Sequence, residues 1–225
     1  MRTPCLAFTV LLTLAASAQT PAPPQPPATP TRASLAGAYD GGQMEVAAQL
    51  ILKPDGHFQY ELAYGALDET AAGTWDVKDS VVLLTTVPAA VPPRFVVVSD
   101  TPAPSGLHVK LTKPLVEGMR QRVLLLYGAN PRPDQDSDEA DVADDGQVPI
   151  PAGKHPTAFI PEIPVFPTLP APIPLTAGGH RFVLRFEPND IGKADFHPQP
   201  LTIQDGVLIM PRRDLQLLLR FKRQP

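Results

Sequence analysis

An acidic stretch from Asp134 to Asp145 comes closest to a metal site in residue type and spacing. Asp134, Asp136 and Asp138 alternate along the chain, and carboxylates from a loop of this kind gather hard cations such as Ca²⁺. These three aspartates are therefore the candidate calcium ligands. The match to an EF-hand loop fails at the sixth position, where Glu139 replaces the glycine of the sharp turn. A solvated acidic loop is the favoured interpretation, and calcium binding is the alternative.

The histidines and potential nucleophiles form no recognisable catalytic motif. The five histidines are isolated, with no pair two or four residues apart; they stand at positions 57, 108, 155, 180 and 197. Gly-x-Ser-x-Gly, Ser-x-x-Lys, P-loop and His-Glu-x-x-His motifs are absent from the sequence. We assign no catalytic residue and no cofactor, although a triad built from distant residues would be invisible at this level.

Two aromatic residues are candidates for ligand contact. Tyr60 lies in an alternating apolar run, and Trp75 follows Gly73 and Thr74 on another. Aromatic side chains line the mouths of ligand-binding barrels, but the interior of a small barrel is normally filled by its own side chains. We favour Trp75 as a core plug and keep ligand contact as the alternative.

A proline-rich segment near residue 165 has a period of three, with prolines at positions 161, 164, 167 and 170. Polyproline II has three residues per turn, so one edge of such a helix would be apolar along ~28 Å. That edge carries Ile160, Ile163, Phe166 and Leu169. We predict a polyproline II strap that buries this edge on the protein's own sheet, since exposed stripes of this size are uncommon. Docking on a partner's aromatic groove is the alternative.

Alternating apolar residues predict the elements that position these side chains. Residues 46–52 and 58–64 flank the turn at Asp55 and Gly56, which makes the clearest hairpin in the chain. Similar short runs follow, so we predict an all-β fold, with a small antiparallel barrel or sandwich over residues 34–128. An amphipathic helix over residues 43–53 is the rival interpretation, and the matching partner strand argues against it.

The region from Leu35 to about residue 86 resembles the N-terminal barrel of NlpE-type periplasmic lipoproteins and, more loosely, lipocalin-like small barrels of bacterial envelopes. The resemblance lies in Leu35-x-Gly37-x-Tyr39, Leu50-x-Leu52-x-x-Asp55-Gly56-x-Phe58, Gly65, Gly73-Thr74-Trp75 and Val81-x-Leu83. It implies a lipocalin-like barrel. The Cys-x-x-Cys pair and the lipidation motif of the NlpE family are absent here, so copper handling and redox sensing are not implied.

The first residues read as an export signal. An apolar run of about 12 residues follows Arg2 and ends at Ala16-Ser17-Ala18, a signal peptidase pattern, so the mature chain should begin at Gln19. The run is too short to span a membrane. Cys5, the only cysteine, opens this run instead of following it, which argues against a lipoprotein. We expect an exported protein, periplasmic or secreted, that does not span the membrane.

The predicted organisation has five parts. Alternation returns near the C-terminus, where Asp205-Gly206 separates two strands and residues 215–221 form a third. We expect this C-terminal β segment to pack on the barrel. The parts are a signal peptide (1–18), a proline-rich disordered spacer (19–33), the barrel domain (34–128), an acidic loop (129–149), and the strap with the C-terminal β segment (150–225).

Composition limits the function. The formal net charge is −4 and no basic field is present, which argues against a nucleic-acid partner. The leading hypothesis is a non-catalytic β-barrel module that acts through an envelope protein or another envelope component. The second is a carrier of an apolar small molecule or lipid inside the barrel. A calcium-dependent or hydrolytic enzyme is the third.

Overall fold

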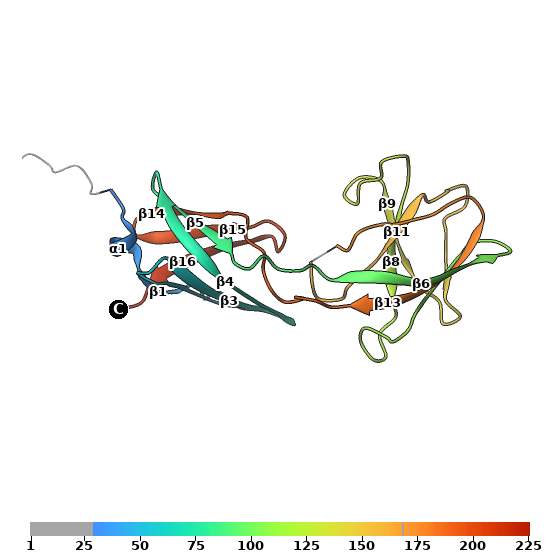
Figure 1. Ribbon diagram of the computed structural model, residues 1–225, viewed down its shortest axis with the longest axis horizontal. Helices are drawn as coiled ribbons and strands as arrows, with labels where there is room; N and C mark the ends of the chain where they lie inside the picture. The colour runs from blue at the N-terminus through green and yellow to red at the C-terminus, as the bar shows by residue number, and fades with distance from the viewer. Residues whose placement is uncertain (1–28, 168) are drawn as a thin grey trace, which may run out of the picture.

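The computed structural model describes residues 29–167 and 169–225. The predicted signal peptide and most of the proline-rich spacer lie outside these residues. The described chain forms two β bodies that follow one another along the long axis of the molecule (Figure 1). The predicted all-β fold with a small antiparallel barrel is confirmed. No helix in the described part of the chain is long and apolar enough to cross a membrane.

The first body is a closed eight-stranded antiparallel barrel, preceded by the short helix α1 (Arg32–Leu35). Its order is β1-β16-β15-β14-β5-β4-β3-β2, and pairing of β1 with β16 closes it. The strands are β1 (Gly37–Asp40), β2 (Val46–Leu52), β3 (His57–Tyr64), β4 (Leu67–Lys78), β5 (Val81–Thr86), β14 (Gln199–Gln204), β15 (Val207–Arg212) and β16 (Leu217–Arg223).

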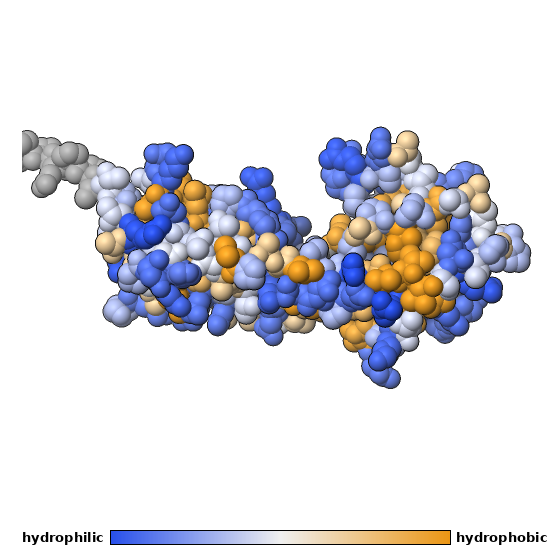
Figure 2. Space-filling view, viewed as in Figure 1, coloured by the Kyte–Doolittle hydropathy of each residue, from blue (hydrophilic) through white to orange (hydrophobic). Residues whose placement is uncertain are grey.

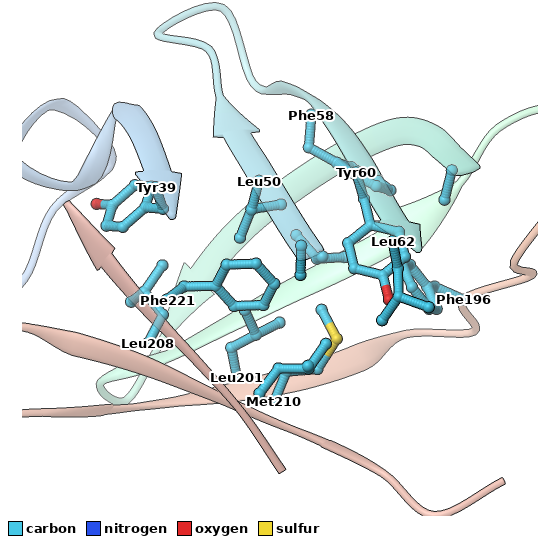
Figure 3. Close-up of a cluster of buried hydrophobic side chains, with 14 of the residues drawn as sticks. Tyr39, Leu50, Phe58, Tyr60, Leu62, Phe196, Leu201, Leu208, Met210 and Phe221 are labelled. Carbon is cyan, nitrogen blue, oxygen red and sulfur yellow. The ribbon is translucent and has the colours of Figure 1, made fainter. Parts of the chain in front are cut away.

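The barrel interior is occupied by packed side chains (Figure 3). Every second residue of each strand points inward, as the burial of alternate residues in β2 and β4 shows. Aromatic rings fill much of the space: Phe196 lies 6.2 Å from Phe58 and 5.3 Å from Tyr60 between ring centroids. The hairpin predicted around Asp55-Gly56 is confirmed as β2 and β3, and the rival helix over residues 43–53 is wrong.

The second body is a sandwich of two four-stranded sheets. One sheet has the order β10-β7-β13-β6, from β6 (Arg94–Ala103), β7 (Leu107–Leu111), β10 (Gln147–Val148) and β13 (Gly179–Glu187). The other has the order β12-β11-β8-β9, from β8 (Arg122–Leu126), β9 (Ser137–Asp141), β11 (Ala158–Pro161) and β12 (Ile173–Pro174). Both sheets contribute to one apolar core, which includes Val109, Leu125, Phe159 and Phe182.

The boundaries of the barrel differ from those predicted. Strands β6, β7 and β8 were expected inside a barrel domain ending at residue 128, but they belong to the sandwich. The C-terminal segment does not pack on a finished barrel, because β14, β15 and β16 are three of its eight strands. The sandwich is thus inserted between β5 and β14. The alternating pattern is the same in both bodies, so it could not show which strands pair.

The acidic segment 129–149 is not a loop throughout. Residues 137–141 form β9, which pairs with β8 at the edge of its sheet. Arg122 of β8 lies opposite Asp141 and forms ion pairs with Glu139 and Asp141. Charged side chains on an edge strand discourage pairing with a second chain. The acidic run therefore protects a sheet edge.

Two connecting segments, residues 87–93 and 188–198, run between the bodies (Figure 1). They are cross-linked to one another. The Val91 amide donates to Asp190 at 2.9 Å, the Ala90 amide donates to Asp195 at 3.2 Å, and the Asn189 side chain donates to the Pro92 carbonyl at 2.8 Å. The connection is therefore a hydrogen-bonded pair of segments at one end of the barrel.

Candidate functional site

The barrel end that faces this connection carries a buried cluster of charged residues. Arg212, the last residue of β15, donates from Nη1 to the Tyr60 hydroxyl and from Nη2 to Glu69 Oε2, both at 2.8 Å. Its Nε and Nη2 donate to the two carboxylate oxygens of Asp214 at 3.0 and 2.7 Å. Arg212 and Glu69 are 5% and 6% exposed. Such burial is rare for charged residues unless they are paired.

The strand register explains why these residues meet. Glu69 follows Leu67 and precedes Ala71 on the inward face of β4, and Arg212 follows Met210 on the inward face of β15. Arg212 is thus the last inward residue of β15 and Glu69 the second inward residue of β4, and their hydrogen bond places both charges at the same end of the barrel. The guanidinium is planar with donors on two edges, so it can bind two carboxylates at once.

The pair of Arg212 and Asp214 favours its charged form. Burial acts to raise the pKa of Asp214, but the hydrogen bonds and charge of Arg212 outweigh it, so this pKa lies below its ordinary value. Burial acts to lower the pKa of Arg212, and the hydrogen bonds of Asp214 and Glu69 raise it above its ordinary value. Burial also raises the pKa of Tyr60, which keeps the phenol protonated. Arg212 is thus a fixed cation.

A cavity of about 360 Å³ lies between this cluster and the connecting segments. We call it the junction pocket. It is lined by Glu69, Arg212 and Asp214 from the barrel, by residues 90–93 and 190–196 from the connections, and by Phe166 and Pro167. Parts of the chain more than a hundred residues apart therefore enclose one space.

One acceptor in this site is unused. Glu69 Oε2 accepts from Arg212, whereas Oε1 is buried and has no hydrogen-bond partner among the described residues. Leaving a buried polar atom unpaired costs about 1–3 kcal/mol, and more when the group is charged. Such a group calls for an explanation, and an ordered water, an ion or a polar ligand would each supply the missing partner.

Another depression, of about 760 Å³, lies along β2, β3 and β4 and is wider and more open. Ala47 and Ala63 are among its lining residues, together with the exposed acids Glu61 and Asp68. Glu69 borders it as well as the junction pocket. We take the junction pocket as the candidate site because it is the more enclosed space and is lined by all three charged residues of the cluster.

The two aromatic candidates have different positions. Tyr60 belongs to the charged cluster through its hydroxyl. Trp75 is 2% exposed, and its indole Nε1 donates to the Lys53 carbonyl at 2.9 Å. The guanidinium of Arg32 lies over the indole ring at 5.7 Å. Trp75 is therefore a core residue, as favoured from the sequence.

The single apolar edge predicted for the strap is wrong. Ile160 is buried beside Leu124 and Leu126 of the sandwich, Phe166 is partly buried against the barrel core, and Leu169 is 52% exposed. Val165 has φ 75°, which is outside polyproline II and unusual for a β-branched residue. This turn redirects the chain, so the four side chains do not share one environment. Ile163 is buried, as expected.

The three candidate calcium ligands do not converge. Asp138 is bound by Lys154 Nζ at 2.6 Å and by the Tyr127 hydroxyl at 2.8 Å. Asp134 pairs with Arg132 instead. Within residues 29–167 and 169–225, no group of three or more His, Cys, Asp or Glu side chains could hold a metal ion.

The sandwich contains one arrangement that resembles a hydrolase relay. His180 Nδ1 lies 3.0 Å from both carboxylate oxygens of Asp100, and Nε2 lies 3.1 Å from the hydroxyl of Thr176. However, Nε2 is also 3.1 Å from the Thr176 carbonyl, which can only accept. Both nitrogens thus face acceptors, and the hydrogen bond to Asp100 raises the pKa of His180. The geometry suits a structural cross-link better than a general base. We call this set of hydrogen bonds between His180, Asp100 and Thr176 the His180 latch.

Because of the His180 latch, we expect the free energy of unfolding of the protein to depend on pH. Because the pKa of His180 is raised in the folded state, its contribution is complete below the ordinary value of 6.5 and is lost as the pH rises through the folded-state pKa. We therefore expect His180→Asn to destabilise the protein at acid pH and to matter less at alkaline pH. Urea unfolding across this range measures the difference. The matched control is His155→Asn at an exposed position, and an effect of His180→Asn that is equal at all pH values would contradict the latch.

Glu69 and Arg212 were missed in the sequence, although a signal was present. Each is a charged residue at an inward position of an alternating strand, where the pattern calls for an apolar side chain. Because these two inward residues have opposite charges, they could have suggested a buried ion pair. Of the residues predicted as contacts, Phe166 lines the junction pocket, and Tyr60 is buried behind it and accepts a hydrogen bond from Arg212.

Comparisons with models of protein families, with curated proteins and with solved structures found no match to this chain.

Proposed function

We propose that this protein is an exported, non-catalytic binding module whose ligand site is the junction pocket. The observation that carries the proposal is the cluster in which buried Arg212 and Glu69 meet the half-exposed Asp214, because all three line one partly enclosed cavity. Enclosed cavities with a few placed polar groups are the usual form of small-molecule sites. The barrel holds the cluster, and the connections to the sandwich supply the walls.

The filled barrel argues against the carrier hypothesis. Trp75, Tyr39, Tyr60 and Phe58 are among the largest fully buried side chains of the chain, and they occupy the barrel interior. An apolar molecule inside would have to displace them. A binding site at the barrel end needs no such rearrangement.

The chemistry of the junction pocket suits binding better than catalysis. The cluster consists of a guanidinium, two carboxylates and a phenol that stays protonated. Arg212 is already hydrogen-bonded through its three nitrogens. These groups offer charge and hydrogen bonds, whereas nucleophilic catalysis requires an activated nucleophile with its base.

A fragment screen by protein NMR tests the proposal. We expect hits to shift the resonances of Ile191 and Ala194 in the pocket wall and to leave Leu50 and Leu84 in the barrel interior unchanged. Ala90→Trp should fill the pocket and abolish these shifts, and Ala89→Trp, at a neighbouring exposed position outside the lining, should not. Hits that instead shift barrel-interior resonances would support the carrier hypothesis.

A protein partner is the second candidate, and the sandwich supplies the observation. On the face shown in Figure 2, apolar residues gather over the sandwich more than over the barrel. Val97 and Val98 of the edge strand β6 are 42% and 51% exposed. The register of β6 with β13 shifts beside these residues, and such bulges discourage simple strand addition. Such a partner would therefore contact side chains more than the strand's backbone.

Export is part of the proposal and has its own expected result. The mature protein should begin at Gln19, because Ala16-Ser17-Ala18 provides the cleavage pattern. Intact mass spectrometry of the native protein should find a chain without residues 1–18 and without an acyl group. A retained N-terminal segment or a lipid mass would contradict it.

A further inference from the structure

The charge balance at the junction pocket indicates what it binds. Two carboxylates, Glu69 and Asp214, share the single guanidinium of Arg212, which leaves one negative charge in excess. The wider lining repeats this imbalance, because Asp190 and Asp195 join the carboxylates and Lys193 is the one further cation. The Lys193 ammonium is itself bound to Asp190 at 2.6 Å. The pocket is therefore acidic.

The pocket also offers a free hydrogen-bond acceptor at its buried end, whereas its main cationic donor is engaged. Glu69 Oε1 is a buried acceptor without a partner among the described residues. The main cationic donor nearby is already engaged, since Arg212 binds Tyr60, Glu69 and Asp214. A carboxylate or phosphate ligand would find few donors and an excess of like charge. A cationic donor would satisfy the free oxygen and the excess charge together.

Part of the pocket wall is apolar or aromatic. Phe166, Phe196 and Ile191 line it, with Val91 and Pro92 on the connecting segment. Aromatic faces attract cations as well as apolar groups. The cavity of about 360 Å³ is at the small end of the range for small-molecule sites.

We infer that the junction pocket binds a small organic ammonium ion with an apolar tail, an inference that rests on the proposed binding function. The ammonium donates to Glu69 Oε1 and neutralises the excess charge. The tail packs against Phe166 and the proline wall. Because Oε1 is enclosed, the ammonium enters the cluster instead of resting at the rim of the pocket.

Three probes of matched shape test the inference: 2-phenylethylammonium, 2-phenylethanol and 3-phenylpropanoate. They are titrated into the full mature chain at low ionic strength, with binding followed by calorimetry and by the NMR resonances of Ile191 and Ala194. We expect the ammonium to bind the pocket at least about tenfold more tightly than the alcohol, as loss of one charge-assisted hydrogen bond implies. The carboxylate should not bind.

Glu69→Gln keeps the shape of the side chain and removes its charge. It should weaken binding of the ammonium by at least about tenfold. Asp68→Asn, the same change at the adjacent exposed position, should leave it unaltered. If Glu69→Gln fails to fold, the order of the three probes on the unaltered protein still decides. Equal binding of the alcohol at the pocket would overturn the ammonium inference alone, whereas failure of all three probes and of the fragment screen would overturn the proposed function as well.

Discussion

Replacing Arg212 with methionine is expected to lower the free energy of unfolding by about 3–5 kcal/mol, the usual cost of removing one partner of a buried ion pair. Glu69 would be left as a buried carboxylate without its cation, and Tyr60 would lose its hydrogen bond. Asp214 contributes less to the loss because 47% of its side chain is exposed. Chemical denaturation, followed through the fluorescence of the single tryptophan, measures the change.

The neighbouring residue supplies the control. Arg213→Met makes the same substitution at an exposed position and should change stability little. The double variant Arg212→Met with Glu69→Leu should recover most of the loss, because well-packed apolar residues often replace a buried ion pair without cost. A double variant as unstable as Arg212→Met alone would mean that the ion pair is not the source of the effect.

Trp75→Ala is expected to cost about 3–5 kcal/mol, the range for deleting a large buried aromatic side chain. Trp75 is 2% exposed within the barrel core, so its removal leaves a cavity among neighbours that are also buried. The Lys53 carbonyl also loses one of its two donors and keeps the Gly56 amide. Circular dichroism replaces fluorescence here, since Trp75 is the only tryptophan.

An exposed aromatic residue gives the comparison for this second variant. Tyr64 is on the adjacent strand β3 and is 37% exposed, so Tyr64→Ala should cost much less. Similar losses for the two variants would argue against Trp75 as a core plug. Binding of the ammonium should survive Trp75→Ala under conditions where the variant remains folded, because Trp75 does not line the junction pocket.

Local signals predicted the strands well. The hairpin of β2 and β3 follows from two alternating runs around Asp55-Gly56, and β14 and β15 follow from the same logic around Asp205-Gly206. In each case the turn residue and the period of two act within a few residues of one another. The information for these elements is local, so a single sequence contains it.

Pairing between distant strands could not be predicted in the same way. Leu84 of β5 lies opposite Gln199 of β14, with the whole sandwich between them in the sequence. An alternating strand shows which residues face inward but does not name its neighbour. The acidic run was interpreted as a loop for the same reason. Charge is advantageous there because β9 lies at a sheet edge, and that position is a property of the assembled sheet.

The candidate site was only partly predictable. Tyr60 was identified as an aromatic residue of an alternating strand, and Phe166 as part of the apolar edge with a period of three. Their environment came from Glu69 and Arg212, which are joined by the closed barrel, and from the turn at Val165 that leads to Phe166. A site formed by three distant parts of the chain depends on topology more than on any local motif.

The insertion of the sandwich between β5 and β14 sets an order for biogenesis. A chain made from its N-terminus completes β1 to β5, then all eight strands of the sandwich, and only afterwards the three strands that close the barrel. Until residue 223 pairs with Tyr39, the half-built barrel has open edges at β1 and β5, and unpaired edges invite aggregation. The inserted body is therefore the first part of the molecule able to reach its native structure, and the barrel that carries the charged cluster is the last.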